Sequence, residues 1–442
     1  MSVTIKIHRG TDQIGGTITE IYTENTHIFI DFGSELSVTK DKSTDANMVK
    51  MINRTKYDAV LFTHYHGDHI GLMGKIPEKD IREKQIRLCM GEVSRDILRN
   101  IHKTLLKNPK INETERAEHE HILQILDDKK RWKNLSEGKS FEIGDFKITP
   151  VNVDHSAYNA FLFIIESEGK CIVHTGDFRT HGRLGRDLFE RLSKHLEGRR
   201  VDVLLTEGTM MSRLSEKVLT EEELEKKAIK ELEKPENKYA FLVCSSTNVE
   251  SLASFHNAAL KLKRPFIVNY YVYEQIQLYK KSAGVNNAKF KLCKTYKFEP
   301  MEEFNPKLGS TQPEYMKEKG FVMLVGTSDT YTERMECFRQ NDPLLIYSMW
   351  SGYLDENNLA FDPKLKALYD KWPRHNTELH TSGHAYKEDI EEMIRLVNPV
   401  EAIIPMHTEK KSMFSRLDIG DLQGKVCLLS DGECYVVGEK NN

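Results

Sequence analysis

The sequence lacks the features of a membrane protein and of a disulfide-bonded secreted protein. It has no uninterrupted apolar run of the roughly 18–20 residues that span a bilayer, and its N-terminal stretch, MSVTIKIHRG, does not have the architecture of a signal peptide. We therefore expect the protein to stay in the cytoplasm. The seven cysteines are scattered and form no Cys-x-x-Cys pair, which predicts reduced core thiols rather than a disulfide framework or a cysteine-ligated zinc site.

An excess of charge of one sign is also missing. Lysine and arginine total 64 against 67 aspartates and glutamates, and the formal net charge is −3. Such a chain has no general attraction for nucleic acid, so binding of a polyanion would depend on a local groove or on a metal cluster. The 442 residues are enough for roughly two or three domains with a buried core.

The pattern of apolar residues divides the chain into three parts. Strand-like patterns dominate residues 1–207, apart from a charged segment at 92–135 that we expect to be helical. Buried strands then alternate with helical stretches over residues 208–380, which is typical of a parallel α/β unit. We predict that this unit is inserted into a first domain, whose chain returns at residues 381–442 and closes with a hairpin over residues 425–438.

The segment LFTHYHGDHIG, residues 61–71, contains three histidines and one aspartate directly after an apolar run. Side chains two positions apart share one face, so His64 and His66 could bind the same metal ion, while Asp68 and His69 could hold a second ion nearby. A lone histidine in a loop is usually an ordinary surface residue. Four potential ligands at this spacing, at the end of a buried strand, predict a metal centre instead.

The spacing His-x-His-x-Asp-His after a buried strand resembles the signature of the metallo-β-lactamase fold. Asp31 in IFIDFG, His155 in VNVDHS and Asp177 in HTGDFR match further motifs of that fold, in the same order. The resemblance implies an α/β protein built on an αββα sandwich. It also implies that Asp31 supports the metal-binding loop and that His155 and Asp177 are metal ligands.

The chain also resembles one branch of this fold family, the β-CASP nucleases, and within it ribonuclease J. Glu207 in LLTEGT, His384 in HTSGHA and His407 in IIPMHTE match motifs A, B and C of that branch. The resemblance implies that the insert is a parallel α/β β-CASP domain. Because the chain stops soon after His407, we expect the C-terminal domain of ribonuclease J to be missing. Two departures stand out: Gly208 stands where serine is common, and Glu250 with the next serine stands where ribonuclease J tends to be basic.

The resemblance implies a zinc-dependent ribonuclease with two metal ions, for which manganese is the alternative. The ions would activate a hydroxide that attacks a phosphodiester bond of single-stranded RNA. His384 is expected to act as general acid, with Glu207 as the carboxylate that keeps it protonated, and Asp68 is counted with these catalytic residues. The implied ligands are His64, His66, His155 and Asp177 for one ion, and Asp68, His69, Asp177 and His407 for the other.

Other functions stay open at the level of sequence. DNA-repair members of the branch carry valine at motif C, so His407 favours RNA over DNA as the substrate. A small-molecule hydrolase of the glyoxalase type shares the metal loop but not the insert, and a non-catalytic RNA-binding scaffold would not need every ligand position filled. The expected partner is single-stranded RNA, no membrane contact is expected, and a homodimer is left open. The candidate phosphate contacts are Thr381, Ser382, Ser246 and Asn248, with turn formation or helix capping as the alternative roles.

Overall fold

The computed structural model describes residues 2–36, 43–77, 86–213, 219–282, 295–297, 316–358 and 360–439. The chain forms two compact units. The first consists of Met1–Thr180, Leu184–Glu216 and Gly383–Asn442, and the second of His181–Arg183 and Lys217–Ser382. The second unit therefore interrupts the first along the chain, while the domain boundaries given above remain a prediction. No helix within the described ranges is long and apolar enough to cross a membrane.

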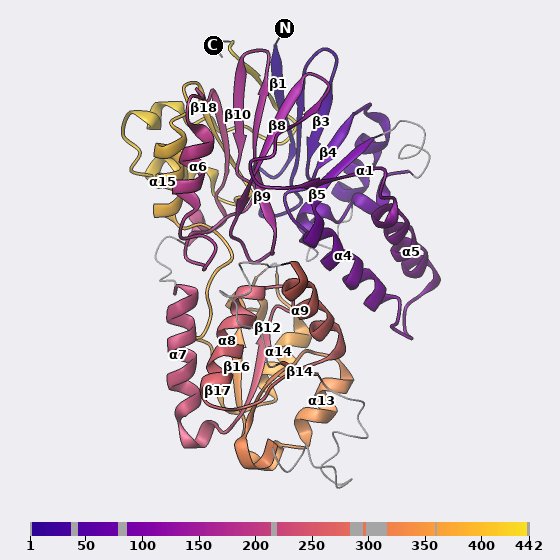
Figure 1. Cartoon of the computed structure of the whole chain (residues 1–442), viewed down its shortest axis with the longest axis vertical. Helices are drawn as coiled ribbons and strands as arrows, with labels where there is room; N and C mark the ends of the chain where they lie inside the picture. Colours follow the sequence, from indigo (N-terminus) through magenta and orange to yellow (C-terminus); the bar gives the residue numbers. More distant parts are fainter. Residues whose placement is uncertain are drawn as a thin grey trace. The chain divides into compact units, whose positions relative to one another are not determined.

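Two sheets face each other in the first unit (Figure 1). The apolar core between them includes Ile5 and Ile28 from one sheet and Phe163 and Ile404 from the other, all fully buried. In hydrogen-bonded order, the first sheet contains β19 (Cys434–Val437), β1 (Val3–Arg9), β2 (Ile18–Tyr22), β3 (His27–Ile30), β4 (Ala59–Leu61), β5 (Arg87–Gly91) and β6 (Trp132–Leu135), and the second contains β18 (Ala402–Met406), β11 (Val203–Glu207), β10 (Lys170–His174), β9 (Ala160–Ser167), β8 (Phe146–Val153) and β7 (Phe141–Ile143).

Helices cover the two sheets of this unit on their outer sides (Figure 1). On the second sheet, Leu192 and Ile394 come from two neighbouring helices and join a separate apolar core. The arrangement confirms the αββα sandwich. The helices are α6 (Leu188–Leu196) and α15 (Lys387–Val397) on the second sheet, and α1 (Ser43–Arg54), α4 (Glu92–Leu105) and α5 (Glu113–Asp127) beside the first.

The directions of the strands gather several loops at one edge of the first unit. β10, β11 and β18 run parallel to one another, and β9 is antiparallel to both β8 and β10. The carboxyl ends of β8, β10, β11 and β18 therefore lie at the same edge of the second sheet. In the first sheet, β3 and β4 are parallel and also end at a common edge. Each of these six strands ends at, or is soon followed by, a residue of the predicted metal centre.

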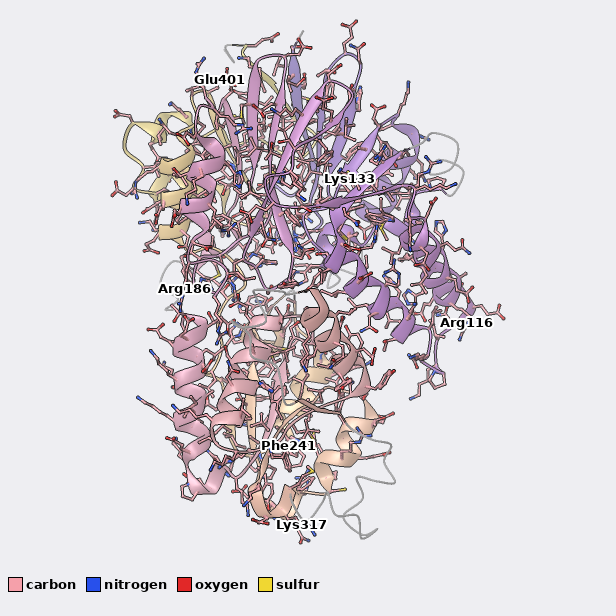
Figure 2. All side chains as sticks on the ribbon, viewed as in Figure 1. Arg116, Lys133, Arg186, Phe241, Lys317 and Glu401 are labelled. Atoms are coloured by element: carbon pink, nitrogen blue, oxygen red, sulfur yellow. The ribbon has the colours of Figure 1, made fainter. Side chains whose placement is uncertain are left out.

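The second unit is built on a parallel sheet, as the alternation of strands and helices predicted. Phe241, in the interior of this unit (Figure 2), is fully buried and packs against the ring of Trp372 at a centroid distance of 5.2 Å. In hydrogen-bonded order the strands are β14 (Thr295–Lys297), β13 (Phe266–Val268), β15 (Phe321–Leu324), β12 (Tyr239–Cys244), β16 (Leu344–Ser348) and β17 (His375–Asn376). The helices are α7 (Glu221–Glu233), α8 (Val249–Lys261), α9 (Tyr270–Ser282), α13 (Asp329–Glu336) and α14 (Pro363–Asp370).

Two expectations about local structure are wrong. The segment 92–135 is not helical throughout, because α5 ends at Asp127 and the last four residues form β6, whose Trp132 is buried. The closing hairpin is absent as well. β19 pairs with β1 of the first sheet, whereas Val426 bridges to Ile403 of the second sheet, so the turn between them crosses from one sheet to the other.

The cysteines are only partly core residues. All six described cysteines are free, which agrees with the expected absence of a disulfide framework among them. Cys337 and Cys434 are exposed, however, so burial does not explain every cysteine. Cys293 lies outside the described residues. The buried ones are Cys89, Cys171 and Cys244.

Candidate metal centre

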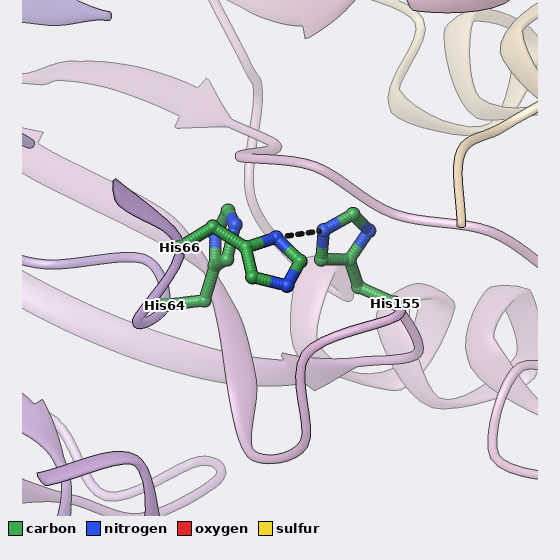
Figure 3. A group of neighbouring side chains, drawn as sticks. All are labelled: His64, His66 and His155. Carbon is green, nitrogen blue, oxygen red and sulfur yellow. Dashed lines mark hydrogen bonds between the residues drawn. The ribbon is translucent and has the colours of Figure 1, made fainter. Parts of the chain in front are cut away.

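Three histidine side chains from two loops meet at one point (Figure 3). His64 and His66 lie between the end of β4 and the short helix α2 (Gly67–Ile70), and His155 comes soon after the end of β8. His66 Nδ1 lies 3.1 Å from His155 Nε2, and one nitrogen from each ring lies within 4.8 Å of the other two. Three imidazoles at this separation could hold one metal ion.

A second group of potential ligands adjoins the first. Asp68 and His69 belong to α2, while Asp177 follows β10 and His407 follows β18. His407 Nε2 lies 3.2 Å from Asp68 Oδ2, and His69 Nε2 lies 3.1 Å from Asp177 Oδ2. The same Asp177 oxygen lies 3.8 Å from His155 Nε2 and 3.7 Å from His407 Nε2. Asp177 therefore lies between the two groups, where one carboxylate could bridge two ions.

Asp31 orients one of these histidines. It is fully buried directly after β3, with a φ of 62°, a left-handed conformation that is uncommon for a residue other than glycine. Its carboxylate accepts hydrogen bonds from Thr63 N at 2.8 Å, from Thr63 Oγ1 at 2.7 Å and from His69 Nδ1 at 2.8 Å. Because Nδ1 of His69 donates to Asp31, its Nε2 is the nitrogen left for a metal. Thr63 carried no sequence signal of its own.

Burial keeps the first group of histidines in the form that binds metal ions. It lowers the pKa of His66 to about 4 and the pKa values of His64 and His155 well below their usual range. All three rings are therefore neutral near pH 7, and neutral imidazole is the ligand form. Within the described part of the chain, the buried His64 Nε2 has no hydrogen-bond partner. Three neutral imidazoles, one of them with an unpartnered nitrogen, are ligands that suit a zinc ion.

Negative charge accumulates at the second group. Burial opposes ionisation of Asp68 and Asp177, but neighbouring histidines, His69 and His407 among them, hold the pKa of each carboxyl below its usual range. Burial also opposes a charge on His69, yet the carboxylates of Asp177, Asp68 and Asp31 raise its pKa well above its usual range. The charge of a protonated His69 thus offsets part of the negative charge of three neighbouring carboxylates, of which Asp31 and Asp177 are buried. A divalent cation bound here would likewise compensate the negative charge of these carboxylates.

Glu207 and His384 are in contact with each other beside these groups. His384 Nδ1 lies 3.1 Å from Glu207 Oε2 and 3.7 Å from Asp177 Oδ2. The other oxygen of Glu207 accepts a hydrogen bond from Phe178 N at 2.8 Å, which fixes the carboxylate. Burial lowers the pKa of His384, but Glu207 and Asp177 outweigh it and raise the pKa above its usual value. Glu207 and His384 also lie close enough to Asp177 and His407 to share a metal ion with them. Distance alone therefore does not show whether His384 is a general acid or a metal ligand.

Local packing explains the glycine in motif A. A Cβ atom at Gly208 would lie 2.6 Å from the Phe414 ring and 3.1 Å from Thr408 Cβ, which leaves no room for a serine. The neighbouring Thr209 places its hydroxyl 2.7 Å from His407 Nδ1, so His407 presents Nε2 to the site. Thr209 was not singled out in the sequence, because its partner lies almost two hundred positions further along the chain.

The acidic residue in the insert has a structural partner. Glu250 is buried in the second unit, and its Oε2 accepts a hydrogen bond from Arg183 N at 2.6 Å. The buried Arg183 guanidinium also bonds Glu225 at 2.7 Å and Ser254 at 3.0 Å. Glu250 therefore holds the Arg183 segment within the unit, which accounts for an acid at a position where ribonuclease J tends to be basic.

The candidate phosphate contacts all lie in the second unit. Asn248 caps α8, because its Oδ1 accepts a hydrogen bond from Ser251 N at 3.2 Å. The hydroxyl of Thr381 donates to the carbonyl of Leu219. The Asn248 contact is the capping role named as an alternative, whereas the Thr381 contact joins segments 162 positions apart and is not a turn. A role in phosphate binding remains a prediction. The full set is Thr381, Ser382, Ser246 and Asn248.

Two further residues join the loops that carry His155 and Asp177. Asp154 and Arg179 are both buried, and Arg179 Nε lies 3.2 Å from Asp154 Oδ1. Their backbones are also linked, since Arg179 N donates to the carbonyl of Asp154 at 2.8 Å. His155 is held on its other side by the carbonyl of Gly383, 2.6 Å from its Nδ1. Adjacency to the motif residues was the only sequence signal for this pair.

Comparison with known proteins agrees with this geometry. Residues 44–233 match the model of the beta-lactamase superfamily domain, and residues 375–416 match the model of the Zn-dependent metallo-hydrolase RNA specificity domain. Ribonuclease J of Mycoplasma pneumoniae is 24% identical over 432 residues, which cover 88% of this chain and 66% of the relative. The match thus spans slightly less than two thirds of that relative's length.

A crystal structure of a protein of unknown function from Enterococcus faecalis V583 has a similar fold over almost the whole chain. The TM-score is 0.68 at 21% identity, and the match covers 99% of this chain and all of the other. That similarity supports the fold alone. Two segments of the chain thus match the models of a beta-lactamase superfamily domain and of a Zn-dependent metallo-hydrolase RNA specificity domain, and the chain as a whole resembles ribonuclease J.

Proposed function

We propose that the protein is a zinc-dependent ribonuclease that hydrolyses phosphodiester bonds of single-stranded RNA. The observation that carries this proposal is the pair of adjoining ligand groups that share Asp177 at one edge of the sandwich. The match to an RNA specificity domain, which includes His384 and His407, supports RNA as the substrate.

The side chains divide between two metal ions. One would be held by the three histidines of Figure 3 together with Asp177. Asp177 would also take part in the second site, whose other members are Asp68, His69 and His407. When bound, two divalent ions at these sites would supply a hydroxide at neutral pH and would neutralise charge on the scissile phosphate. Asp31 and Thr209 fix which nitrogen each of two ligand histidines presents.

His384 is the residue proposed to protonate the leaving oxygen. Its Nδ1 donates to Glu207, so the proton on Nε2 is the one available for transfer. After that transfer, Nδ1 keeps its proton and its bond to Glu207, which holds the ring in place. The side chain is 21% exposed, against 2% for Asp177, so a substrate can reach it.

A preference for RNA over DNA is the direct test of this function. We expect metal-loaded protein to cleave single-stranded RNA much faster than DNA of the same sequence, because the 2′-hydroxyl distinguishes the two. RNAs with a 5′-monophosphate, triphosphate or hydroxyl, run beside the matched DNA on a denaturing gel, measure both the preference and the cleavage pattern. Equal rates on RNA and DNA would favour a DNA nuclease of the same branch. Turnover of small thioesters without cleavage of either polymer would favour a metallo-hydrolase of small molecules.

A further inference from the structure

A small internal cavity lies behind the metal centre. It is lined by three of the proposed ligands, His69, Asp177 and His407, and by residues that the proposed function does not use, among them Thr17 and His174. About 10 Å³ is available there for the centre of a water molecule. That space is enough for one water, provided that polar groups hold it.

His174 supplies an unpartnered donor to this cavity. It is the last residue of β10 and is 3% exposed. Gly176 N donates to its Nδ1 at 3.1 Å, so the proton of the neutral ring is on Nε2. Burial lowers the pKa of His174 to about 3, which keeps the ring neutral. Nε2 nevertheless has no hydrogen-bond partner among the described residues, and a buried donor left in that state is unfavourable.

Thr17, the residue directly before β2, supplies a second unpartnered group. Its side chain is 2% exposed, and within the described ranges its Oγ1 has no hydrogen-bond partner. Its backbone is tied to the metal loop, because Thr17 N donates to the carbonyl of Asp68 at 3.1 Å. Two residues with an unpartnered polar atom, one at the end of β10 and one just before β2, therefore line the same water-sized space.

We propose that one water molecule is bound in this cavity as a fixed part of the fold, where it accepts a hydrogen bond from His174 Nε2 and bonds Thr17 Oγ1. The water joins the residue before β2, whose backbone bonds Asp68, to the end of β10, three positions before Asp177. His174 and Thr17 are thereby positioning residues for the metal ligands. This positioning role rests on the proposed metal centre, whereas the water site itself does not.

The direct test is a crystal structure at a resolution that shows ordered water. We expect a density peak at about 2.7–3.1 Å from both His174 Nε2 and Thr17 Oγ1, without anomalous signal at the zinc edge. The peak should be lost in His174→Phe and kept in His174→Gln, whose amide can donate. Thr19→Val is the matched control, since Thr19 lies two positions after Thr17, in β2, and is also buried, but bonds Met406 Sδ and does not line the cavity. An empty cavity, or a zinc peak inside it, would overturn the proposal.

Zinc affinity tests the positioning role separately. His174→Phe should raise the zinc dissociation constant roughly tenfold, the usual consequence of disturbing a group behind a ligand, and His174→Gln should restore most of the affinity. Thr17→Val should have an effect in the same direction, and the double variant Thr17→Val/His174→Phe should be no worse than the poorer single variant, because both act through one water. Unchanged affinity in all variants, with the water present, would reject the positioning role. If the wild-type protein bound no zinc, the proposed metal centre would be rejected. The water site would then be tested by the crystal structure alone.

Discussion

Replacement of His66 by alanine is expected to reduce RNA hydrolysis to the background of the assay while the protein stays folded. His66 lies 3.1 Å from His155 and belongs to the three-histidine group, so its loss leaves too few ligands for one of the two ions. The fold should survive, because the cores of the sandwich consist of apolar side chains from both sheets and from the helices on the second sheet. Activity on RNA, circular dichroism and bound zinc measure the three parts of this result.

His195→Ala is a suitable control for that experiment. His195 lies in α6, and its Nε2 is 3.5 Å from Glu137 Oε1, outside the groups of potential ligands. It should keep wild-type zinc content and activity. If His66→Ala retained substantial turnover with its zinc content unchanged, His66 would not be a ligand and the first metal site would have to be reassigned.

Replacement of His384 by alanine is expected to slow RNA cleavage by about 10²–10⁴-fold, the usual range for assistance by a general acid, without loss of metal. The loss should shrink on a nitrophenyl phosphodiester, because that leaving group departs without a proton. His407→Ala should behave differently, with weaker binding of one metal ion and loss of activity on both substrates. Rates on the two substrates and zinc content for each variant separate the two roles.

The same comparison resolves the ambiguity in the geometry. Glu207, His384, Asp177 and His407 lie close enough to share an ion, so His384 could in principle be a ligand. Equal losses on RNA and on the activated ester, or loss of zinc from His384→Ala, would show that His384 binds metal or positions substrate. A loss confined to RNA is the outcome that general acid catalysis requires.

The sequence predicted the parts of the site that depend on short-range spacing. His64, His66, Asp68 and His69 lie within six positions at the end of a buried strand, so their spacing alone predicted a metal centre. The more distant residues, His155, Asp177 and His407 among them, were identified through the resemblance to the metallo-β-lactamase and β-CASP motifs. The supporting contacts could not be predicted in this way. Thr209 meets His407, and Phe414 excludes a side chain at position 208, only because distant segments pack together.

The errors in the fold have the same physical origin. Alternating apolar residues near the C-terminus predicted strands correctly at Cys434–Val437, but alternation does not specify which strand is the partner. The segment that begins at Trp132 follows a long charged helical pattern, and its role as an edge strand depends on pairing with β5. Which strand pairs with which depends on tertiary packing, and both errors concern strand pairing.

The most direct test of the two-metal site is a titration of metal-free protein with zinc, in which bound zinc and RNA cleavage are measured on the same samples. Two ions per chain should bind, because two ligand groups share Asp177, and cleavage should rise to its plateau only as the second equivalent is taken up. Full activity at one equivalent, or RNA cleavage by the metal-free protein, would contradict a two-metal ribonuclease.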